Sequence, residues 1–244
     1  VVGLPLSLLF RHKPEQYGYL SDGERSHTGF PGEGPVPAQI YDVHIGVKQA
    51  LRSRAFWHIG LAIAFQFLAV NALIVHIIPY LSSVGIARST SSLVVMGTGI
   101  TNFVGRLVSG KVSDSINRTR VAAGFIAITC LALLFFSYAS IERVWLLVPF
   151  TILFGLGWGG MSPMRGVLVR EYFGRAKFGT ILGLLMGMTA LGSVGGPLFV
   201  GWIFDRQGSY HVAWLVVTCF VLAALIVMAT TQPLRIAAQP DDNM

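Results

Sequence analysis

Six long apolar segments follow one another along the chain, and they constrain its fold more than any other feature. They cover about residues 56–81, 89–112, 121–140, 144–169, 178–204 and 212–231. An α-helix needs roughly 20 apolar residues to cross a bilayer, and each segment is close to that length or longer. Lipid offers no hydrogen-bond partner to an exposed backbone, so these segments predict transmembrane helices. Their short connections predict that consecutive helices are antiparallel neighbours.

The composition supports an all-α, polytopic membrane protein. The chain has 53% hydrophobic and 12% charged residues, and its mean hydropathy is +0.65. A soluble domain has about 25% charged residues. The net charge of +7 would suggest nucleic acid in a soluble protein, but here the basic residues flank apolar segments and no nucleic-acid partner is expected. Cys130 and Cys219 lie inside apolar segments, so neither a disulfide framework nor a zinc site is expected.

The sequence divides into four regions. Residues 1–10 are apolar but span only half a bilayer, and we interpret them as the end of a helix whose beginning is missing. Residues 11–55 form a polar connector rich in Gly and Pro, which ends in an amphipathic segment over 43–54 that is typical of a helix on the membrane surface. Residues 56–232 hold the six spans, and 233–244 form a tail.

Basic residues are distributed unequally between the two sides of the predicted spans. The connector, two further loops and the tail share one side, which carries Arg11, Lys13, Arg25, Lys48, Arg52, Arg54, Lys111, Arg118, Arg120, Arg170, Arg175, Lys177 and Arg235. The loops on the other side carry one arginine each, Arg88, Arg143 and Arg206. The positive-inside rule then places the connector and the C-terminus in the cytoplasm of a multi-pass protein of the cell membrane.

Arg106 is the residue that most directly suggests a function. It lies within the 89–112 segment, where a cation costs roughly 2.5–3.5 kcal/mol on insertion scales. Such a charge normally faces a partner or a water-filled path, so we interpret Arg106 as a site for an anionic group. Asn102 is one helical turn earlier and shares its face. The alternative is that Arg106 lies near the cytoplasmic end and extends its side chain to the interface.

The loop that follows Arg106 carries a family resemblance. Gly110, Asp114, Asn117 and Arg118 have the spacing Gly-x-x-x-Asp-x-x-Asn-Arg, and Arg120 comes next. This resembles the Gly-x-x-x-Asp-Arg-x-Gly-Arg signature of the major facilitator superfamily, which joins the second and third helices of each six-helix half. The resemblance implies that Asp114 caps or pairs with a neighbouring helix end and acts as a latch for one conformer. The alternative is an ordinary solvated turn.

Two positions in this loop depart from the family pattern. Ser115 stands where a base is usual, which weakens the charge network of the loop. Asn117 stands where Gly is usual. Asn tolerates a left-handed backbone better than most residues, so we still expect the turn to form.

Further motifs resemble the monocarboxylate porter and oxalate/formate antiporter branch of that superfamily. They are Ala50-Leu-Arg-Ser-Arg-Ala-Phe-Trp57, His76-Ile-Ile-Pro-Tyr-Leu81 with Gly85-Ile86, Gly105-Arg106, and Glu171-Tyr-Phe-Gly-Arg-Ala-Lys-Phe-Gly179. The branch binds the substrate carboxylate with an arginine of the eighth helix, and the resemblance assigns that role to Arg106. Asn102 stands where animal porters carry a proton-coupling Asp, and residues 178–204 lack the Lys of oxalate antiporters.

Each of the other polar residues in the spans has a functional and a structural interpretation. Arg165 is a candidate either for the cavity or for helix packing, and His76 either for a proton site or for a hydrogen-bonded structural residue. Gln66 and Asn71 are candidate cavity residues. Small-residue repeats indicate close helix packing or flexing during a conformational cycle; they are Gly155-x-x-x-Gly159, Gly183-x-x-x-Gly187 and Gly192-x-x-x-Gly196.

Together these observations predict the C-terminal six-helix bundle of a twelve-helix transporter, with residues 1–10 as the end of its sixth helix. We expect it to move a small organic anion, a monocarboxylate, by alternating access between two halves. Its expected partners are that anion, the lipid bilayer and the missing N-terminal half, with no cofactor or metal. The alternatives are a transporter of unrelated cargo, such as a drug effluxer, and a membrane-embedded enzyme, against which no nucleophile–base pair or metal cluster appears in the spans.

Overall fold

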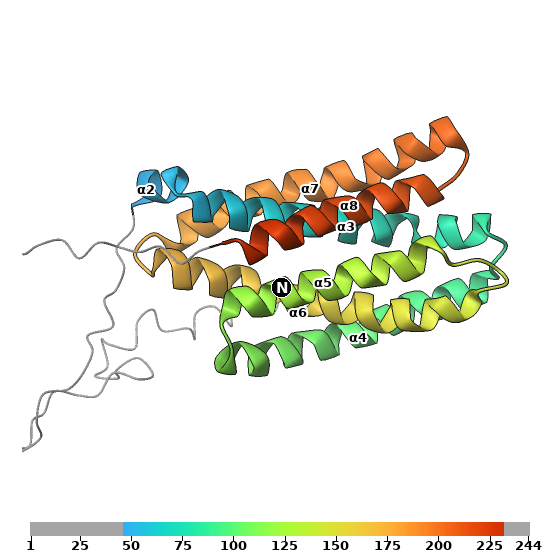
Figure 1. Ribbon diagram of the computed structural model, residues 1–244, viewed down its shortest axis with the longest axis horizontal. Helices are drawn as coiled ribbons and strands as arrows, with labels where there is room; N and C mark the ends of the chain where they lie inside the picture. Colours follow the sequence, from blue (N-terminus) through green and yellow to red (C-terminus); the bar gives the residue numbers. More distant parts are fainter. Residues whose placement is uncertain (1–45, 232–244) are drawn as a thin grey trace, which may run out of the picture. The chain divides into compact units, whose positions relative to one another are not determined.

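The computed structural model describes residues 46–231, and these form an all-helical bundle (Figure 1). The expected helix end at 1–10, most of the connector and the 233–244 tail lie outside the described residues. The helices are α2 (Val47–Arg52), α3 (Arg54–Ser83), α4 (Arg88–Ser115), α5 (Arg118–Ser137), α6 (Leu147–Phe173), α7 (Phe178–Gln207) and α8 (His211–Ala229), with a 3₁₀ turn at Val144–Leu146. Six of them are long and apolar enough to cross a membrane, which confirms the predicted all-α membrane fold.

The ends of these helices have local causes. Ser53 is extended, with φ −78° and ψ 140°, and its hydroxyl accepts from the Phe56 amide at 3.2 Å, so it separates α2 from α3 and caps the latter. The predicted surface helix is therefore shorter than expected and covers only Val47–Arg52 within the described residues. Gly174 and Gly208, with φ of 73° and 66°, follow the last residues of α6 and α7. Glycine adopts these angles without the Cβ clash that other residues meet.

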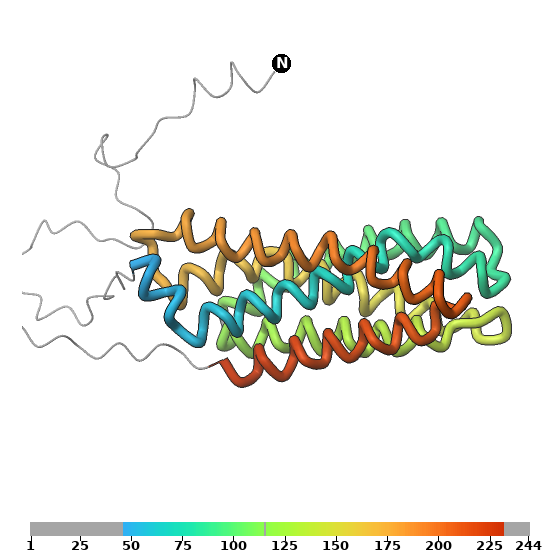
Figure 2. The backbone as a smooth tube through the Cα atoms, turned by 90° about the horizontal axis from the view of Figure 1, so that it is seen from above, coloured from blue at the N-terminus to red at the C-terminus, as the bar shows by residue number. Residues whose placement is uncertain are grey.

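The six spans pack as two groups of three that meet along α5 and α8. In one group α6 packs against both α4 and α5, and in the other α3 packs against both α7 and α8 (Figure 1, Figure 2). Contacts between α5 and α8 join the groups on one side, whereas α4 and α7 make no extensive contact with each other. These two helices are also the least buried of the six spans. Their free faces are therefore open to lipid or to another protein segment.

Glycines set the distance between α4 and α6. A Cβ at Gly159 would clash with the backbone carbonyl of Asn102, and one at Gly155 would clash with the Thr101 side chain. From the other side, a Cβ at Gly105 would lie 2.6 Å from the Leu156 carbonyl oxygen. The two backbones therefore approach more closely than any larger residue would allow, which is the usual role of small residues between transmembrane helices.

The glycine repeats of α7 behave in two ways. Gly192 and Gly196 lie against the backbone carbonyls of Ala64 and Leu68 on α3, where a Cβ would clash. Gly183 and Gly187 were also expected to allow close helix packing, but a Cβ at either would meet nothing within 4 Å in the described chain. The Gly183 repeat therefore makes no close helix contact in this bundle, because it lies on the exposed face of α7.

Gly159→Ala is expected to destabilise the protein, because the added methyl group must push α4 away from α6. Overpacking of this kind costs about 1–3 kcal/mol, more than the ~1 kcal/mol that alanine gains over glycine inside a helix. The free energy of unfolding in mixed detergent micelles measures the effect. Gly124→Ala on α5 is the matched control, since its Cβ meets nothing within 4 Å. Equal effects of the two substitutions would contradict the close contact at Gly159.

Candidate functional site

Arg106 lies in the second half of the span formed by α4. It is nine residues before Ser115, the last residue of that helix, a distance of about 14 Å at 1.5 Å per residue. The side chain is exposed on the free face of α4. Among the described residues no group forms a hydrogen bond or an ion pair with it. Its charge is therefore available to a group outside the bundle.

Asn102 presents a second unused polar group one turn along the same helix. The residue is 7% exposed, and its Nδ2 has no hydrogen-bond partner among the described residues. A buried amide without a partner costs about 1–3 kcal/mol, so such groups are uncommon unless a ligand or water completes them. The close contact of its backbone with Gly159 fixes the position of Asn102 relative to α6.

Arg165 brings a second cation to this region from α6. Its guanidinium carbon lies 4.4 Å above the centre of the Phe67 ring, and its Nε donates to the Ser162 carbonyl at 3.3 Å. Phe67 is near the middle of α3, so the charge lies at mid-depth in the bundle. Arg165 and Arg106 lie on α6 and α4, two helices that pack against each other.

The polar residues of α3 do not all join this pair. Gln66 is fully buried and points toward α5, where its Nε2 donates to Thr129 Oγ1 at 2.7 Å. Its amide is therefore placed in the packed interior rather than on the face that carries Arg106. Asn71 bridges α3 and α7, because its Nδ2 lies 3.1 Å from Ser193 Oγ and 3.0 Å from the Phe67 carbonyl oxygen. It is half-buried one turn from Phe67.

His76 has both ring nitrogens occupied by protein groups. Nε2 lies 3.0 Å from the Pro197 carbonyl oxygen, and Nδ1 lies 3.3 Å from the Tyr210 hydroxyl oxygen. A carbonyl only accepts, so Nε2 carries the proton and Nδ1 accepts from the tyrosine. This arrangement matches the hydrogen-bonded structural alternative for His76, and it ties α3 to α7 and to the start of α8.

The Asp114 loop differs from the arrangement that the family pattern implied. Asp114 is exposed and has no hydrogen-bond or ion-pair partner among the described residues. Asn117 caps the neighbouring helix instead, since its Oδ1 accepts from the amides of Thr119 at 3.0 Å and Arg120 at 3.3 Å. Its backbone has φ −52° and ψ 120°, so the left-handed turn that we expected there is wrong. An Asn side chain caps a helix well without it.

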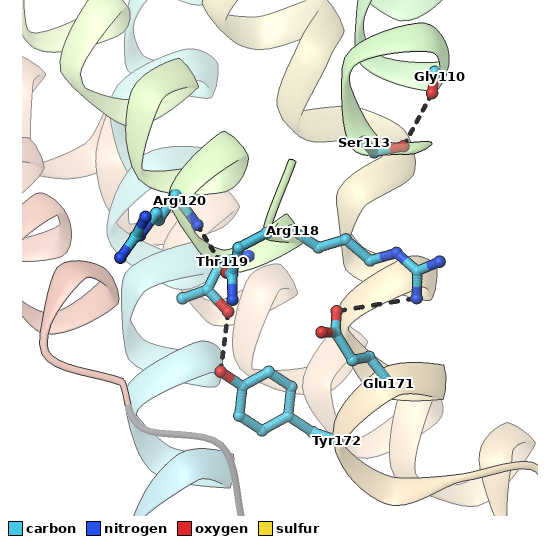
Figure 3. Close-up of polar contacts among 8 residues, drawn as sticks. Gly110, Ser113, Arg118, Thr119, Arg120, Glu171 and Tyr172 are labelled. Carbon is cyan, nitrogen blue, oxygen red and sulfur yellow. Dashed lines mark hydrogen bonds and ion pairs between the residues drawn. The ribbon is translucent and has the colours of Figure 1, made fainter. Parts of the chain in front are cut away.

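Two contacts join the start of α5 to the end of α6 beside this loop (Figure 3). Arg118 Nη1 lies 3.9 Å from Glu171 Oε2, the only ion pair within residues 46–231. Next to it, the hydroxyls of Thr119 and Tyr172 share a buried hydrogen bond of 2.8 Å. Figure 3 also shows Ser113, which donates to the Gly110 carbonyl at 2.9 Å.

Sequence reasoning missed the Thr119–Tyr172 contact. Its only signal was the position of Tyr172 in the Glu171-Tyr-Phe-Gly motif, which did not indicate a partner. The contact depends on the rotation of α5 against α6, which a single sequence does not specify.

Tyr172→Phe is expected to destabilise the protein by about 1–3 kcal/mol, because it leaves the Thr119 hydroxyl buried without a partner. Glu171→Gln is expected to cost less than about 1 kcal/mol, since its ion pair is long and partly exposed. Denaturant titration in mixed micelles measures both. Tyr138→Phe, at an exposed tyrosine, is the control. A larger loss for Glu171→Gln than for Tyr172→Phe would reverse this ranking.

The chemistry that these groups offer is anion binding. Two guanidinium groups and one free amide supply hydrogen-bond donors and positive charge. Among the described residues, no three His, Cys, Asp or Glu side chains are grouped to hold a metal ion. A carboxylate suits this set well, because a guanidinium donates to both of its oxygens at once.

Comparison with known proteins adds information that the geometry lacks. The sequence model of the family described as "Major Facilitator Superfamily" matches residues 59–242. The monocarboxylate transporter 12 of Xenopus laevis is 27% identical over 174 residues, which cover 68% of this chain and 38% of that protein. The glucose transporter GlcP of Staphylococcus epidermidis is 24% identical over 176 residues, which cover 68% of this chain and 39% of that protein.

A solved structure shares the fold. The transporter FucP in its outward conformation superimposes with a TM-score of 0.64 at 16% identity, over 77% of this chain and 45% of FucP. The chain therefore spans less than half the length of each of these proteins.

Proposed function

This chain belongs to the major facilitator superfamily, and on that premise we propose that it forms half of the substrate path of a small organic anion transporter. Members of this superfamily are transporters rather than enzymes, so the membrane-embedded enzyme is excluded. The substrate class that we propose is the monocarboxylates. Two six-helix halves would alternate in access around a site near the middle of the membrane, as in related secondary transporters.

The observation that carries the proposal is the pair of cations on α4 and α6. Arg106 has no partner among the described residues, and Arg165 has only a carbonyl and an aromatic ring. No acidic side chain in residues 46–231 neutralises either charge. Two like charges at this depth are unfavourable in the absence of an anion, since charges in an apolar environment interact more strongly than in water. Binding of a carboxylate between them would remove that repulsion.

The geometry also suggests distinct roles for the three groups. Arg106 is on the exposed face and would donate to both carboxylate oxygens. Arg165 is held by Phe67 and Ser162, so it would supply a fixed positive field rather than the primary contact. The free Nδ2 of Asn102 would donate to a further oxygen of the substrate. Asn71, at the contact between α3 and α7, would line the path on the other side.

The alternative is a transporter of a different cargo, such as a neutral sugar. One relative is named a glucose transporter, and a neutral sugar needs no cation. Arg106 would then be a structural residue whose side chain reaches the interface.

The proposal also includes the orientation of the bundle in the membrane and its contact with the N-terminal half of the transporter. The ends of α4, α5 and α6 that carry Lys111, Arg118 and Arg170 would face the cytoplasm of the cell membrane, with the connector and the C-terminus. The exposed faces of α4 and α7 would meet the N-terminal half of the same transporter. Asp114, free in this bundle, would pair with a group outside the described residues and latch one of the two conformers.

Arg106→Ala is expected to abolish uptake of labelled monocarboxylates by the full-length protein while membrane insertion continues. Removal of the charge relieves an insertion cost of roughly 2.5–3.5 kcal/mol, so the protein should still reach the membrane. Arg106→Lys keeps the charge but loses the two-point contact, so it should recover little affinity. Asn102→Ala should give a milder defect.

Initial uptake rates, corrected for surface expression, measure these effects. Arg88→Ala, at the first residue of α4, is the control for loss of an arginine from the same helix. Near-normal uptake by Arg106→Ala would contradict the assignment of Arg106 to the substrate site. It would favour the alternative in which the Arg106 side chain extends to the membrane interface. Saturable glucose uptake that is unchanged by Arg106→Ala would favour a transporter of neutral sugars.

Asp114→Ala is expected to leave substrate affinity nearly unchanged and to shift the balance between inward-open and outward-open states. The reason is its position near the end of α4, away from Arg106. Accessibility of cysteines introduced on each side of the membrane reports the balance, and binding of labelled substrate reports the affinity. A loss of binding as large as that of Arg106→Ala, in a folded protein, would count against the latch.

A further inference from the structure

A cavity of about 360 Å³ lies at the end of the bundle opposite to the Asp114 loop. Three separate segments line it: the last turn of α3 with Ser83, the α5–α6 connection with Ser140, and the α7–α8 connection with Ser209. Its volume is within the range of roughly 300–1,000 Å³ that is usual for small-molecule sites. Arg106 is 18 residues from the end of α4 that is nearest to it, so the cavity is separate from the proposed substrate path.

Hydrogen bonds between the lining segments hold the cavity open. The Tyr80 hydroxyl of α3 lies 3.0 Å from the Phe136 carbonyl oxygen and 3.1 Å from that of Ala139. His211 Nδ1 donates to the Ser137 carbonyl at 2.9 Å, which joins the start of α8 to the end of α5. These contacts cross from one helix group to the other. The walls are therefore positioned by the fold rather than by a ligand.

The lining is basic. Arg143 and His211 contribute to it, whereas no acidic side chain does. Arg143 forms no ion pair or side-chain hydrogen bond within the described part of the chain. Burial, and then the charge of Asp205, raise the pKa of the Tyr210 hydroxyl, so this group remains a neutral donor to His76. Arg143 is thus a charged group without a partner at the edge of a preformed cavity.

We propose that this cavity binds a small anion with a carboxylate or phosphate group, and that Arg143 is its main charged contact. The guanidinium group would donate to two oxygens of the anion. Ser140, which is half-exposed and lines the same side, would donate a further hydrogen bond. Tyr138 and Tyr210 would contact the apolar part of the ligand. The same oxygen chemistry occurs in soluble carboxylates and in the phosphates of lipid headgroups.

The consequence of binding follows from which elements line the cavity. The α5–α6 connection belongs to the group of α4, α5 and α6, whereas Ser83 and Ser209 belong to the group of α3, α7 and α8. An anion held between them would tie the two groups together at this end of the bundle. The site would therefore regulate the stability of the bundle, and it would not lie on the substrate path.

The test uses the full-length protein with its native cysteines replaced, in nanodiscs of neutral phosphatidylcholine. Ser140→Cys is modified with an uncharged maleimide, with benzoate as the soluble probe. At about ten times its dissociation constant, benzoate should slow modification about tenfold, because only the unoccupied fraction reacts. Arg143→Gln should lose this protection. Arg88→Gln, an exposed arginine at the same end that does not line the cavity, should keep it.

Further measurements identify the source of the anion and show whether its binding is independent of Arg106. Nanodiscs with anionic phosphatidylglycerol should protect Ser140→Cys without benzoate if lipid phosphates occupy the site, again only when Arg143 is present. Protection should survive Arg106→Gln. Ser209→Cys repeats the measurement from the opposite wall if Ser140→Cys does not fold. Equal modification rates in all conditions, or protection that survives Arg143→Gln, would overturn the proposal.

Discussion

The close approach of α4 and α6 is the contact on which the candidate site depends. Gly155 and Gly159 remove the side chains that would hold the two backbones apart. As a result the backbone of Asn102 lies directly against α6. Larger residues at these glycines would push α4, which carries Arg106, away from α6, which carries Arg165. Two hydrogen bonds between the helices accompany this packing, from Thr101 Oγ1 to the Thr151 carbonyl at 2.9 Å and from Ser109 Oγ to the Gly160 carbonyl at 2.8 Å.

Much of the fold follows from the sequence alone. Apolar length predicted all six spans, because a bilayer permits few other structures for such segments. This prediction holds because it depends on one helix at a time. The helical period did not show that Asn102 is buried against α6, whereas Arg106, one turn along α4, is exposed. The sequence did not indicate that Asn117 caps α5: it is adjacent to the first turn of that helix, and its side chain reaches the free amides directly.

Features that involve contacts between two helices could not be predicted from the sequence. Gln66 seemed a candidate for the cavity, but its partner Thr129 lies on α5, and only the rotation of α3 decides which face it joins. Gly183 and Gly187 share the repeat of Gly155 and Gly159, but a Cβ at either would meet nothing within 4 Å among the described residues. The same glycine repeat therefore lies on a packed face in α6 and on an exposed face in part of α7. Contacts across helices depend on rotation and crossing angle, which a repeat of small residues does not specify.

The measurement that tests the central claim most directly is a structure of the full-length transporter with a transported monocarboxylate bound. The account predicts that the carboxylate oxygens lie within hydrogen-bond distance of the Arg106 guanidinium, with Asn102 Nδ2 as a further donor and Arg165 close by. The same density should be absent from a structure of Arg106→Gln under identical conditions. A substrate bound elsewhere, with Arg106 directed to the lipid interface in both conformers, would contradict the account.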